Sequence, residues 1–206
     1  NTQQELDGNK IEYKVGNPRL GDLKYQDLNN DGIINEADKA PIGTGALPRF
    51  TYGISGGVTY KSFDLSFLLQ GIGQYSSVIV GQGVWEADFD GIYGSLHKNA
   101  WTPERYQNGG TITAPALSTV KSSSQEINDY YKYNRSYLRL KNVELSYTLP
   151  GRLSKAISAE RIKFLLSGQN LITWDKMKSK DFGPEGGGYT SFPVYRVFNI
   201  GVNVVF

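Results

Sequence analysis

The sequence of 206 residues contains no cysteine, which excludes disulfide bonds and thiolate metal sites. It holds one histidine and one methionine, and no catalytic pair or triad stands out, so we do not expect an enzyme. No run approaches the roughly eighteen consecutive apolar residues that a membrane-spanning helix needs. The charges nearly cancel, to a net +2, which gives no reason to expect a nucleic-acid partner.

Small and aromatic residues are abundant instead, with 24 glycines, 14 tyrosines and 9 phenylalanines. This composition is typical of β-structure with bends and aromatic belts. It does not suit a helical soluble enzyme, and it favours an all-β fold.

Residues 194–206 show the clearest pattern. Alternate residues from Val194 to Phe206 are apolar apart from Arg196, whereas those between them are mixed, small or polar. Because a strand points alternate side chains to opposite faces, one face of this segment suits an apolar phase. About ten such residues, when tilted, cross the hydrocarbon layer of a bilayer. The pattern therefore predicts a strand of a transmembrane β-barrel.

Four earlier segments alternate in a similar way, at residues 50–60, 63–73, 136–149 and 161–174. The connections between strands alternate in length: they are short at 61–62 and about 150–160, and long at about 74–135 and 175–193. This order is required if every long loop lies outside the membrane. The predicted fold is all-β, with about five C-terminal antiparallel strands of a large transmembrane β-barrel and long extracellular loops.

We expect two regions in the chain. Residues 1–49 form an extracellular loop segment with a calcium-type loop, and residues 50–206 form the barrel strands. Five strands cannot close a barrel, since the smallest have about eight. The chain is therefore expected to be a fragment of a longer protein.

Aromatic residues near the strand ends favour the same fold. Phe50, Tyr137 and Trp174 lie near the long loops, whereas Tyr60, Phe63, Tyr147 and Phe206 lie near the short turns. Two aromatic girdles of this kind mark membrane interfaces. Alternation alone also fits a soluble β-sandwich, in which one face is core and the other is solvated.

The strand at 136–149 contains an irregularity. Leu138 and Leu140 are out of phase with the apolar row that begins at Val143. Either a β-bulge near Asn142 or inward-facing leucines would explain the change of phase.

Residues 27–38 match a twelve-residue calcium loop in which side-chain and carbonyl oxygens recur at fixed positions. The predicted ligands are Asp27, Asn29, Asp31, the carbonyl of Ile33, Asn35 and Asp38. A calcium ion would order an extracellular loop here. The alternative is a turn rich in Asp and Asn that binds nothing.

The long loops carry aromatic residues that suit ligand binding. Trp85, Tyr93 and Trp101 are candidates for contact with a substrate or with a lid protein. The alternative is that they pack the loops. The single histidine, His97, has no nucleophile motif beside it and is expected at the surface.

Several motifs, in order, resemble the C-terminal end of SusC/RagA-type TonB-linked outer-membrane proteins of the Bacteroidetes. They are residues 21–35 (GDLKYQDLNNDGIIN), 48–53 (PRFTYG), 60–65 (YKSFDL), 136–142 (SYLRLKN), 147–150 (YTLP), 167–171 (SGQNL) and the closing Phe206. The resemblance implies a large barrel in outer-membrane lipid, with an N-terminal plug and a TonB complex that supplies energy.

The resemblance also implies a SusD-like surface lipoprotein as a lid, and import of glycan oligosaccharides or oligopeptides. The competing hypothesis is a soluble, calcium-stabilised β-sandwich, such as an adhesin or a carbohydrate-binding module.

Overall fold

The computed structural model describes residues 2–45, 47–81, 84–85, 94–186, 188 and 191–206. The chain divides into two compact units. The loop unit comprises Asn1–Gly45, Ser76–Tyr133 and Met177–Phe192, and the sheet unit comprises Ala46–Tyr75, Asn134–Lys176 and Pro193–Phe206. The loop unit therefore joins the N-terminal segment to most of the two long connections.

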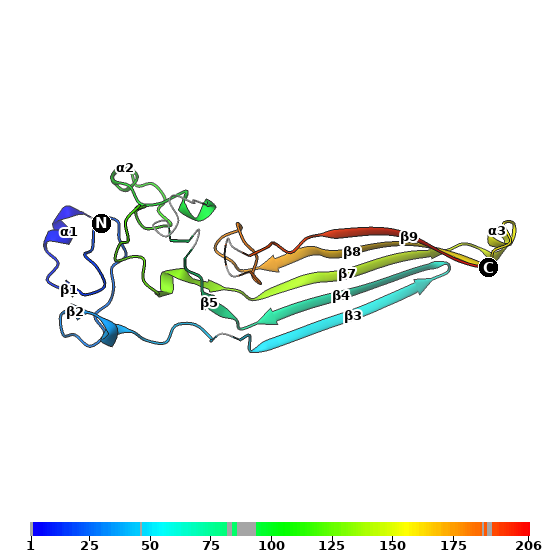
Figure 1. Cartoon of the computed structure of the whole chain (residues 1–206), viewed down its shortest axis with the longest axis horizontal. Helices are drawn as coiled ribbons and strands as arrows, with labels where there is room; N and C mark the ends of the chain where they lie inside the picture. The colour runs from blue at the N-terminus through cyan, green and yellow to red at the C-terminus, as the bar shows by residue number, and fades with distance from the viewer. Residues whose placement is uncertain (1, 46, 82–83, 86–93, 187, 189–190) are drawn as a thin grey trace. The chain divides into compact units, whose positions relative to one another are not determined.

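The sheet unit contains one five-stranded antiparallel sheet, in the order β3-β4-β7-β8-β9 (Figure 1). Its strands are β3 (Phe50–Tyr60), β4 (Phe63–Gly73), β7 (Tyr137–Thr148), β8 (Arg161–Asp175) and β9 (Val197–Val205). All five predicted strands are present, although β9 begins three residues later than the pattern suggested. Each strand pairs with its neighbours along the chain, so the predicted all-β antiparallel fold is confirmed.

The apolar side of this sheet is exposed over its whole width. Ile54 in β3 is 58% exposed and Ile200 in β9 is 86% exposed. The same face carries further exposed apolar residues, and all five strands contribute: Phe50, Tyr52, Val58, Tyr60, Phe63, Leu65, Phe67, Leu145, Phe164, Leu166, Ile172, Trp174, Phe198, Val202 and Val204. Among the described residues of the sheet unit, no second sheet packs on this face, so the unit lacks the second layer of a sandwich.

A bulge in β7 resolves the phase of Leu138 and Leu140. The pairing with β4 passes from Leu68–Asn142 directly to Leu69–Leu140, which leaves Lys141 as an extra residue. The pairing with β8 shifts at the same place. Because of the extra residue, both leucines lie on the same face as Val143 and Leu145. Of the two alternatives, the bulge is confirmed.

Tyr137 does not join the aromatic girdle on the apolar face. It alternates in phase with Arg139, whose guanidinium carbon lies 4.8 Å from the centre of the Tyr137 ring. Both side chains therefore face the polar side of the sheet, and that part of the girdle prediction is wrong. Its cause is the same bulge, which reverses the phase of this end of the strand.

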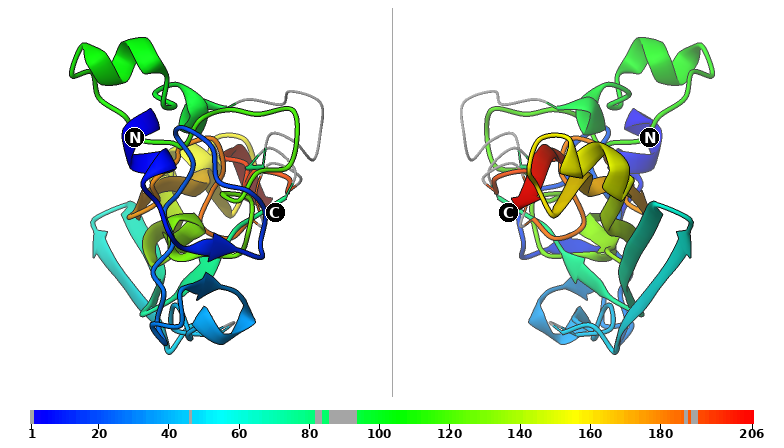
Figure 2. Two further views of the ribbon diagram at one scale, coloured as in Figure 1. Left: turned by 90° about the vertical axis from the view of Figure 1, so that its left-hand side faces the viewer. Right: turned by 90° about the vertical axis from the view of Figure 1, so that its right-hand side faces the viewer.

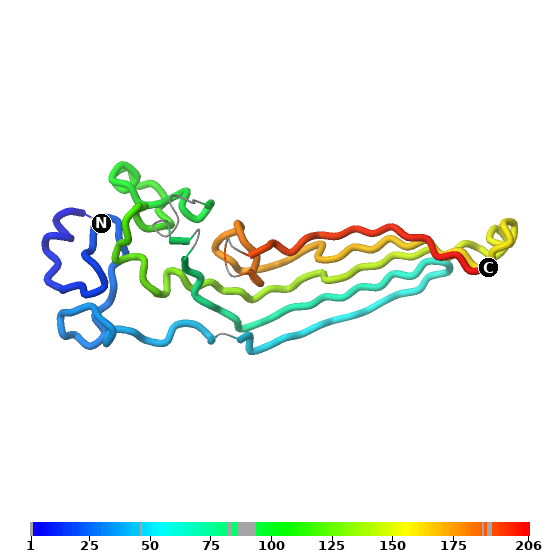
Figure 3. Tube along the Cα trace, in the orientation of Figure 1, coloured from blue at the N-terminus to red at the C-terminus, as the bar shows by residue number. Residues whose placement is uncertain are grey.

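The short connections lie at one end of the sheet. Lys61 takes a positive φ of 55° in the two-residue turn between β3 and β4. The connection from β7 to β8 contains α3 (Gly151–Lys155), which lies at the same end as the C-terminus (Figures 2 and 3). This end of the sheet carries the short turns that the loop pattern predicted.

The loop unit is built from short elements. These are α1 (Gln3–Asp7), β1 (Glu12–Tyr13), β2 (Ile33–Ile34), η1 (Glu36–Asp38), β5 (Ser76–Val78), η3 (Ser95–His97), α2 (Pro103–Gln107), η4 (Asp129–Tyr131) and β6 (Lys132–Asn134). Two small sheets form, β1 with β2 and β5 with β6. Across the described ranges, no helix is long and apolar enough to cross a membrane.

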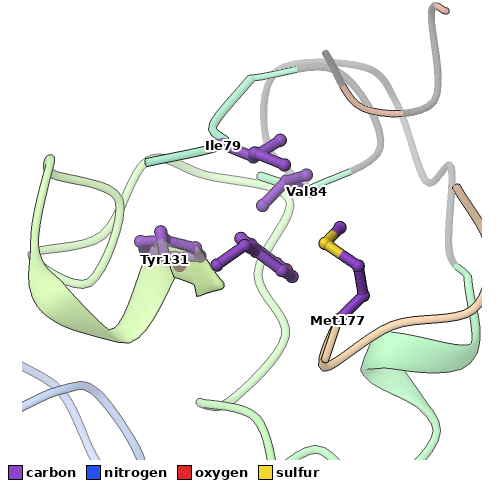
Figure 4. Close-up of a cluster of buried hydrophobic side chains, with 5 residues drawn as sticks. Ile79, Val84, Tyr131 and Met177 are labelled. Carbon is purple, nitrogen blue, oxygen red and sulfur yellow. The ribbon is translucent and has the colours of Figure 1, made fainter. Parts of the chain in front are cut away.

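A small core holds the loop unit together (Figure 4). Ile79, Val84, Tyr131, Tyr133 and Met177 are buried against one another and come from three distant parts of the sequence. Burial raises the pKa of Tyr133 to about 12. The core thus connects the long connection at 76–133 to the one at 177–192.

Candidate functional site

The predicted calcium loop is folded by its own carboxylates. Asp27 accepts hydrogen bonds from the backbone N–H groups of Asn30, at 2.7 Å, and Gly32, at 2.8 Å. Gly32 has a φ of 81°, a left-handed conformation that glycine adopts without strain. The first predicted ligand therefore closes the sharp turn that a calcium loop requires.

Asp38 closes the other side of the loop. Its carboxylate accepts from the N–H of Leu28 at 2.8 Å and from the N–H of Asn35 at 2.9 Å. These two bonds, with that of Asn35 first, hold the pKa of Asp38 below its ordinary value. The Asn35 side chain in turn accepts from the N–H of Ala37 and caps η1. The beginning and end of the loop are therefore tied together.

In the middle of the loop, side-chain oxygens again accept hydrogen bonds from backbone N–H groups. Asn29 accepts from the N–H of Asp31 at 3.0 Å, and Asp31 accepts from the N–H of Ile33 at 2.8 Å. Ile33 then pairs with Glu12, so the loop leads directly into the β1–β2 sheet.

These contacts bear on the fit of a calcium ion. Hard oxygen donors at regular spacing suit calcium, and an oxygen that accepts one N–H bond keeps a lone pair for a cation. In the described part of the chain, however, no three Asp, Glu, His or Cys side chains gather closely enough to hold a metal ion. Calcium binding by the six predicted ligands stays a prediction.

The aromatic candidates occupy different positions. Trp101 is only 8% exposed, and a side-chain carbon at Gly21 would meet its ring at 2.5 Å. Trp85 is half-buried and packs edge-on against Tyr131, with ring centres 6.0 Å apart. Tyr93 lies outside the described residues. The geometry gives Trp101 and Trp85 packing roles, and their contact with a substrate or lid stays a prediction.

His97 is buried rather than at the surface, so that expectation is wrong. It is 7% exposed; its Nδ1 accepts from the N–H of Gly94 at 3.2 Å, and its Nε2 lies 3.2 Å from the carbonyl oxygen of Val84. A neutral ring with the proton on Nε2 satisfies both contacts. The histidine thus joins two backbone segments that are ten residues apart.

Asp22 is an organising residue that the sequence patterns missed. Its side chain is 2% exposed and accepts from the hydroxyl of Ser124 at 3.1 Å and from that of Ser123 at 3.3 Å. It also accepts from the N–H of Arg19 at 2.8 Å. The run of serines at 122–124 was the available signal, but it carries no spacing rule that points to a residue one hundred positions earlier.

In the sheet unit, polar side chains on the other face of the sheet form hydrogen bonds and an ion pair with Asp64. Asp64 accepts from the hydroxyl of Thr59 at 2.8 Å and from that of Ser146 at 3.3 Å, and its carboxylate lies 3.4 Å from Nζ of Lys163. Four adjacent strands contribute to this cluster. The two faces of the sheet therefore differ sharply, with exposed apolar side chains on one side and paired polar groups on the other.

Known proteins provide a comparison. No protein-family model matches the chain. TonB-dependent receptor P3 of Formosa agariphila is 28% identical over 211 residues, which cover 93% of this chain and 20% of the receptor. TonB-dependent receptor P26 of the same organism is 28% identical over 228 residues, covering all of this chain and 21% of that receptor. The chain thus spans about a fifth of the length of these relatives.

Solved structures of a peptide importer are similar to the chain in fold. The RagAB peptide importer in the "closed-closed" state matches with a TM-score of 0.64 and 25% identity, over 83% of this chain and 19% of the solved chain. The importer in the "open-open" state matches with a TM-score of 0.59 and 25% identity, over 78% and 17%. The chain is therefore similar in sequence to part of the TonB-dependent receptors and similar in fold to part of the RagAB peptide importer, and this similarity assigns it to the outer membrane.

Proposed function

We propose that the full-length protein containing this chain imports oligomeric nutrients across the outer membrane, with energy supplied through TonB. Its relatives are TonB-dependent receptors, and the solved neighbours are structures of a peptide importer. The chain covers only about a fifth of such a receptor, so it supplies part of the barrel wall and its external loops.

The exposed apolar face of the five-stranded sheet is the main support for this proposal. Burial of apolar surface stabilises a protein by about 25 cal/mol per Å². A wide apolar face such as the one from Ile54 to Ile200 would be a strong liability in water. In lipid the same face is stable, because it meets acyl chains and the paired strands satisfy their backbone groups internally.

A SusD-like surface lipoprotein is the partner we propose for the external loops. The motif resemblance supports this partner, and the matching solved structures are of an assembly named RagAB. The substrate is an oligosaccharide or an oligopeptide. The matching solved structures are of a peptide importer, which favours a peptide.

The relatives are receptors and the solved neighbours are importers, which supports transport rather than catalysis as the proposed role.

Membrane fractionation of the organism that produces the full-length protein tests the proposal. We expect the protein in the outer-membrane fraction, extractable only with detergent and co-purifying with a lipoprotein. Deletion of its gene should abolish uptake of one class of oligomer, tested with labelled oligosaccharides and peptides in parallel. A full-length protein recovered from the soluble fraction without detergent would support the adhesin or carbohydrate-binding alternative instead.

A further inference from the structure

One positive charge interrupts the apolar face of the sheet. Arg196 lies directly before β9 and shares the alternation of Phe198 and Ile200, which are exposed on that face. Its neighbour Tyr195 is still tied to β8, because the Tyr195 carbonyl oxygen accepts from Nδ2 of Asn170 at 3.1 Å. The segment therefore runs beside β8 at this point, and the alternation places the exposed Arg196 side chain on the apolar face.

Arg196 lies towards the end of the sheet where the long connections begin. The last pair between β8 and β9 at this end is Gln169–Val197, so Arg196 is one step beyond it. Trp174 lies further along β8 on the same face, and the chain from Asn170 to Trp174 spans at most about 13 Å at about 3.3 Å per residue. A tryptophan at such a position marks the level of the lipid headgroups, and the long arginine stem can bring its charge towards that level.

A second cation continues the same line. Lys176 is exposed and follows Trp174 by two residues, directly after the end of β8 at Asp175. Residues two apart in an extended chain share a face, so Lys176 continues the row of Trp174. Across the described ranges, neither Arg196 nor Lys176 forms an ion pair with a carboxylate. Two cations thus lie on either side of Trp174 at the edge of the apolar face.

Two cations on the polar face, in contrast, have partners within the protein. Nζ of Lys163 lies 3.4 Å from the Asp64 carboxylate, and Arg139 donates from Nε to the Thr173 hydroxyl at 2.9 Å. A positive charge against acyl chains is unfavourable, and the cost falls as the charge approaches the headgroups. The partner that suits Arg196 is therefore an anionic group in the headgroup layer.

We propose that Arg196 and Lys176 bind the phosphate group of a lipid in the outer leaflet, with Trp174 between them. This inference rests on the barrel assignment, which puts the long connections, and so this end of the sheet, outside the membrane. A guanidinium offers a phosphate two parallel N–H···O bonds, and an ammonium adds a point charge. The exposed side chains of Ile172 and Phe198 provide an apolar surface for an acyl chain of the same lipid.

Native mass spectrometry of the full-length receptor in mild detergent tests this site. The probes are monophosphoryl lipid A and the same lipid after removal of its phosphate. We expect the receptor to prefer the phosphorylated form, and Arg196→Gln to bind one molecule of it about tenfold more weakly. Lys176→Gln should weaken the same molecule about threefold, since an exposed ammonium contributes less than a bidentate guanidinium. The control Lys155→Gln, at an exposed lysine in α3, should change nothing.

Arg196→Leu provides a second measurement. In nanodiscs of a galactolipid, which carries no phosphate, the variant should melt no lower than the unmodified receptor, because leucine suits acyl chains better than arginine. When monophosphoryl lipid A is added, the melting temperature of the unmodified receptor should rise by about 1–2 °C more than that of the variant. An equal rise in both proteins would overturn the site.

The remaining outcomes separate the site from the proposed function. A receptor that inserts and imports normally but binds both forms of the lipid equally would overturn the site alone. Displacement of the lipid by excess inorganic phosphate would overturn a lipid as the ligand, in favour of a soluble phosphate compound. Equal losses in Arg196→Gln and Lys155→Gln would show only a general attraction of positive charge for the lipid, which also overturns the site. A receptor recovered from the soluble fraction without detergent would overturn both the site and the function.

Discussion

The ring of Tyr52 lies directly over Gly71, its partner in the β3–β4 register. A side-chain carbon at Gly71 would meet Cζ of Tyr52 at 2.5 Å and the backbone oxygen of Tyr137 at 2.7 Å. Tyr52 also donates its hydroxyl to that same oxygen, at 3.4 Å. The glycine thus provides the space in which an aromatic side chain bridges three strands on the apolar face.

Gly71→Ala should therefore destabilise the barrel by about 1–3 kcal/mol, because both the ring and a backbone carbonyl must move. The measurement is the urea dependence of unfolding of the full-length receptor in detergent. Gly53→Ala is the matched control. A side-chain carbon at Gly53 meets only the Leu69 carbonyl oxygen, at 3.7 Å, so the change should be within about 0.5 kcal/mol. Equal effects at both glycines would contradict the prediction.

The Asp27–Asp38 loop should respond to acid through Asp38. Its folded-state pKa is lowered by the N–H groups of Asn35 and Leu28, so the carboxylate stabilises the loop fully above the unfolded-state pKa. That stabilisation is lost as the pH falls through the lower folded-state pKa. Hydrogen exchange of the Leu28 and Asn35 amides, corrected for intrinsic rates, should show protection that persists at neutral pH and disappears only in strong acid.

Asp38→Asn should speed exchange at both amides at neutral pH, since a neutral amide offers one acceptor oxygen in place of two. Glu36→Gln is the control, because Glu36 contacts Lys39 at the surface and neither of the two amides. Unchanged protection in Asp38→Asn would show that other contacts hold the loop.

Calcium binding by the same loop is tested by calorimetry on the full-length protein. We expect a saturable heat with millimolar calcium that is lost in Asp31→Ala, because a hard cation needs that carboxylate among its six to eight oxygen ligands. Asp7→Asn, outside the loop, should retain the heat. No heat in the unmodified protein would leave the loop as a hydrogen-bonded turn.

Asn170 should act through two separable effects in β8. It adopts a left-handed φ of 54°, and its Nδ2 donates to the Tyr195 carbonyl at 3.1 Å. Asn170→Gly removes the hydrogen bond without straining the backbone and should cost about 0.5–1.5 kcal/mol. Asn170→Ala removes the bond and strains the backbone, so it should cost about 1 kcal/mol more. The same urea series measures both, and equal losses would exclude a role for the backbone conformation.

Much of the sheet could be predicted from local pattern. Alternation marks each strand, and the two-residue spacing at Lys61 and Ser62 marks the first hairpin. A bulge near Asn142 could be suspected but not assigned to one residue, because Leu138 and Leu140 reveal a change of phase without showing which residue is extra. The extra residue is identified by the pairing of β7 with β4 and β8, and the sequence of one strand does not reveal this pairing.

The loop unit was less predictable for the same reason. The turn at 27–38 depends on contacts between neighbours, so its residues could be named from spacing alone. Asp22 instead meets Ser123 and Ser124 across about a hundred residues, and His97 is buried with its Nε2 close to the carbonyl oxygen of Val84. Periodicity carries no record of such contacts.

The extra residue Lys141 also determines which face of the sheet Arg139 occupies. If β7 ran regularly through this position, the alternation would turn Arg139 outward and Leu138 and Leu140 inward. An arginine on the lipid side near the bilayer midplane destabilises a barrel by about 2–4 kcal/mol, and less near the interface. One inserted lysine thus keeps a fixed positive charge out of the hydrocarbon and returns two leucines to it.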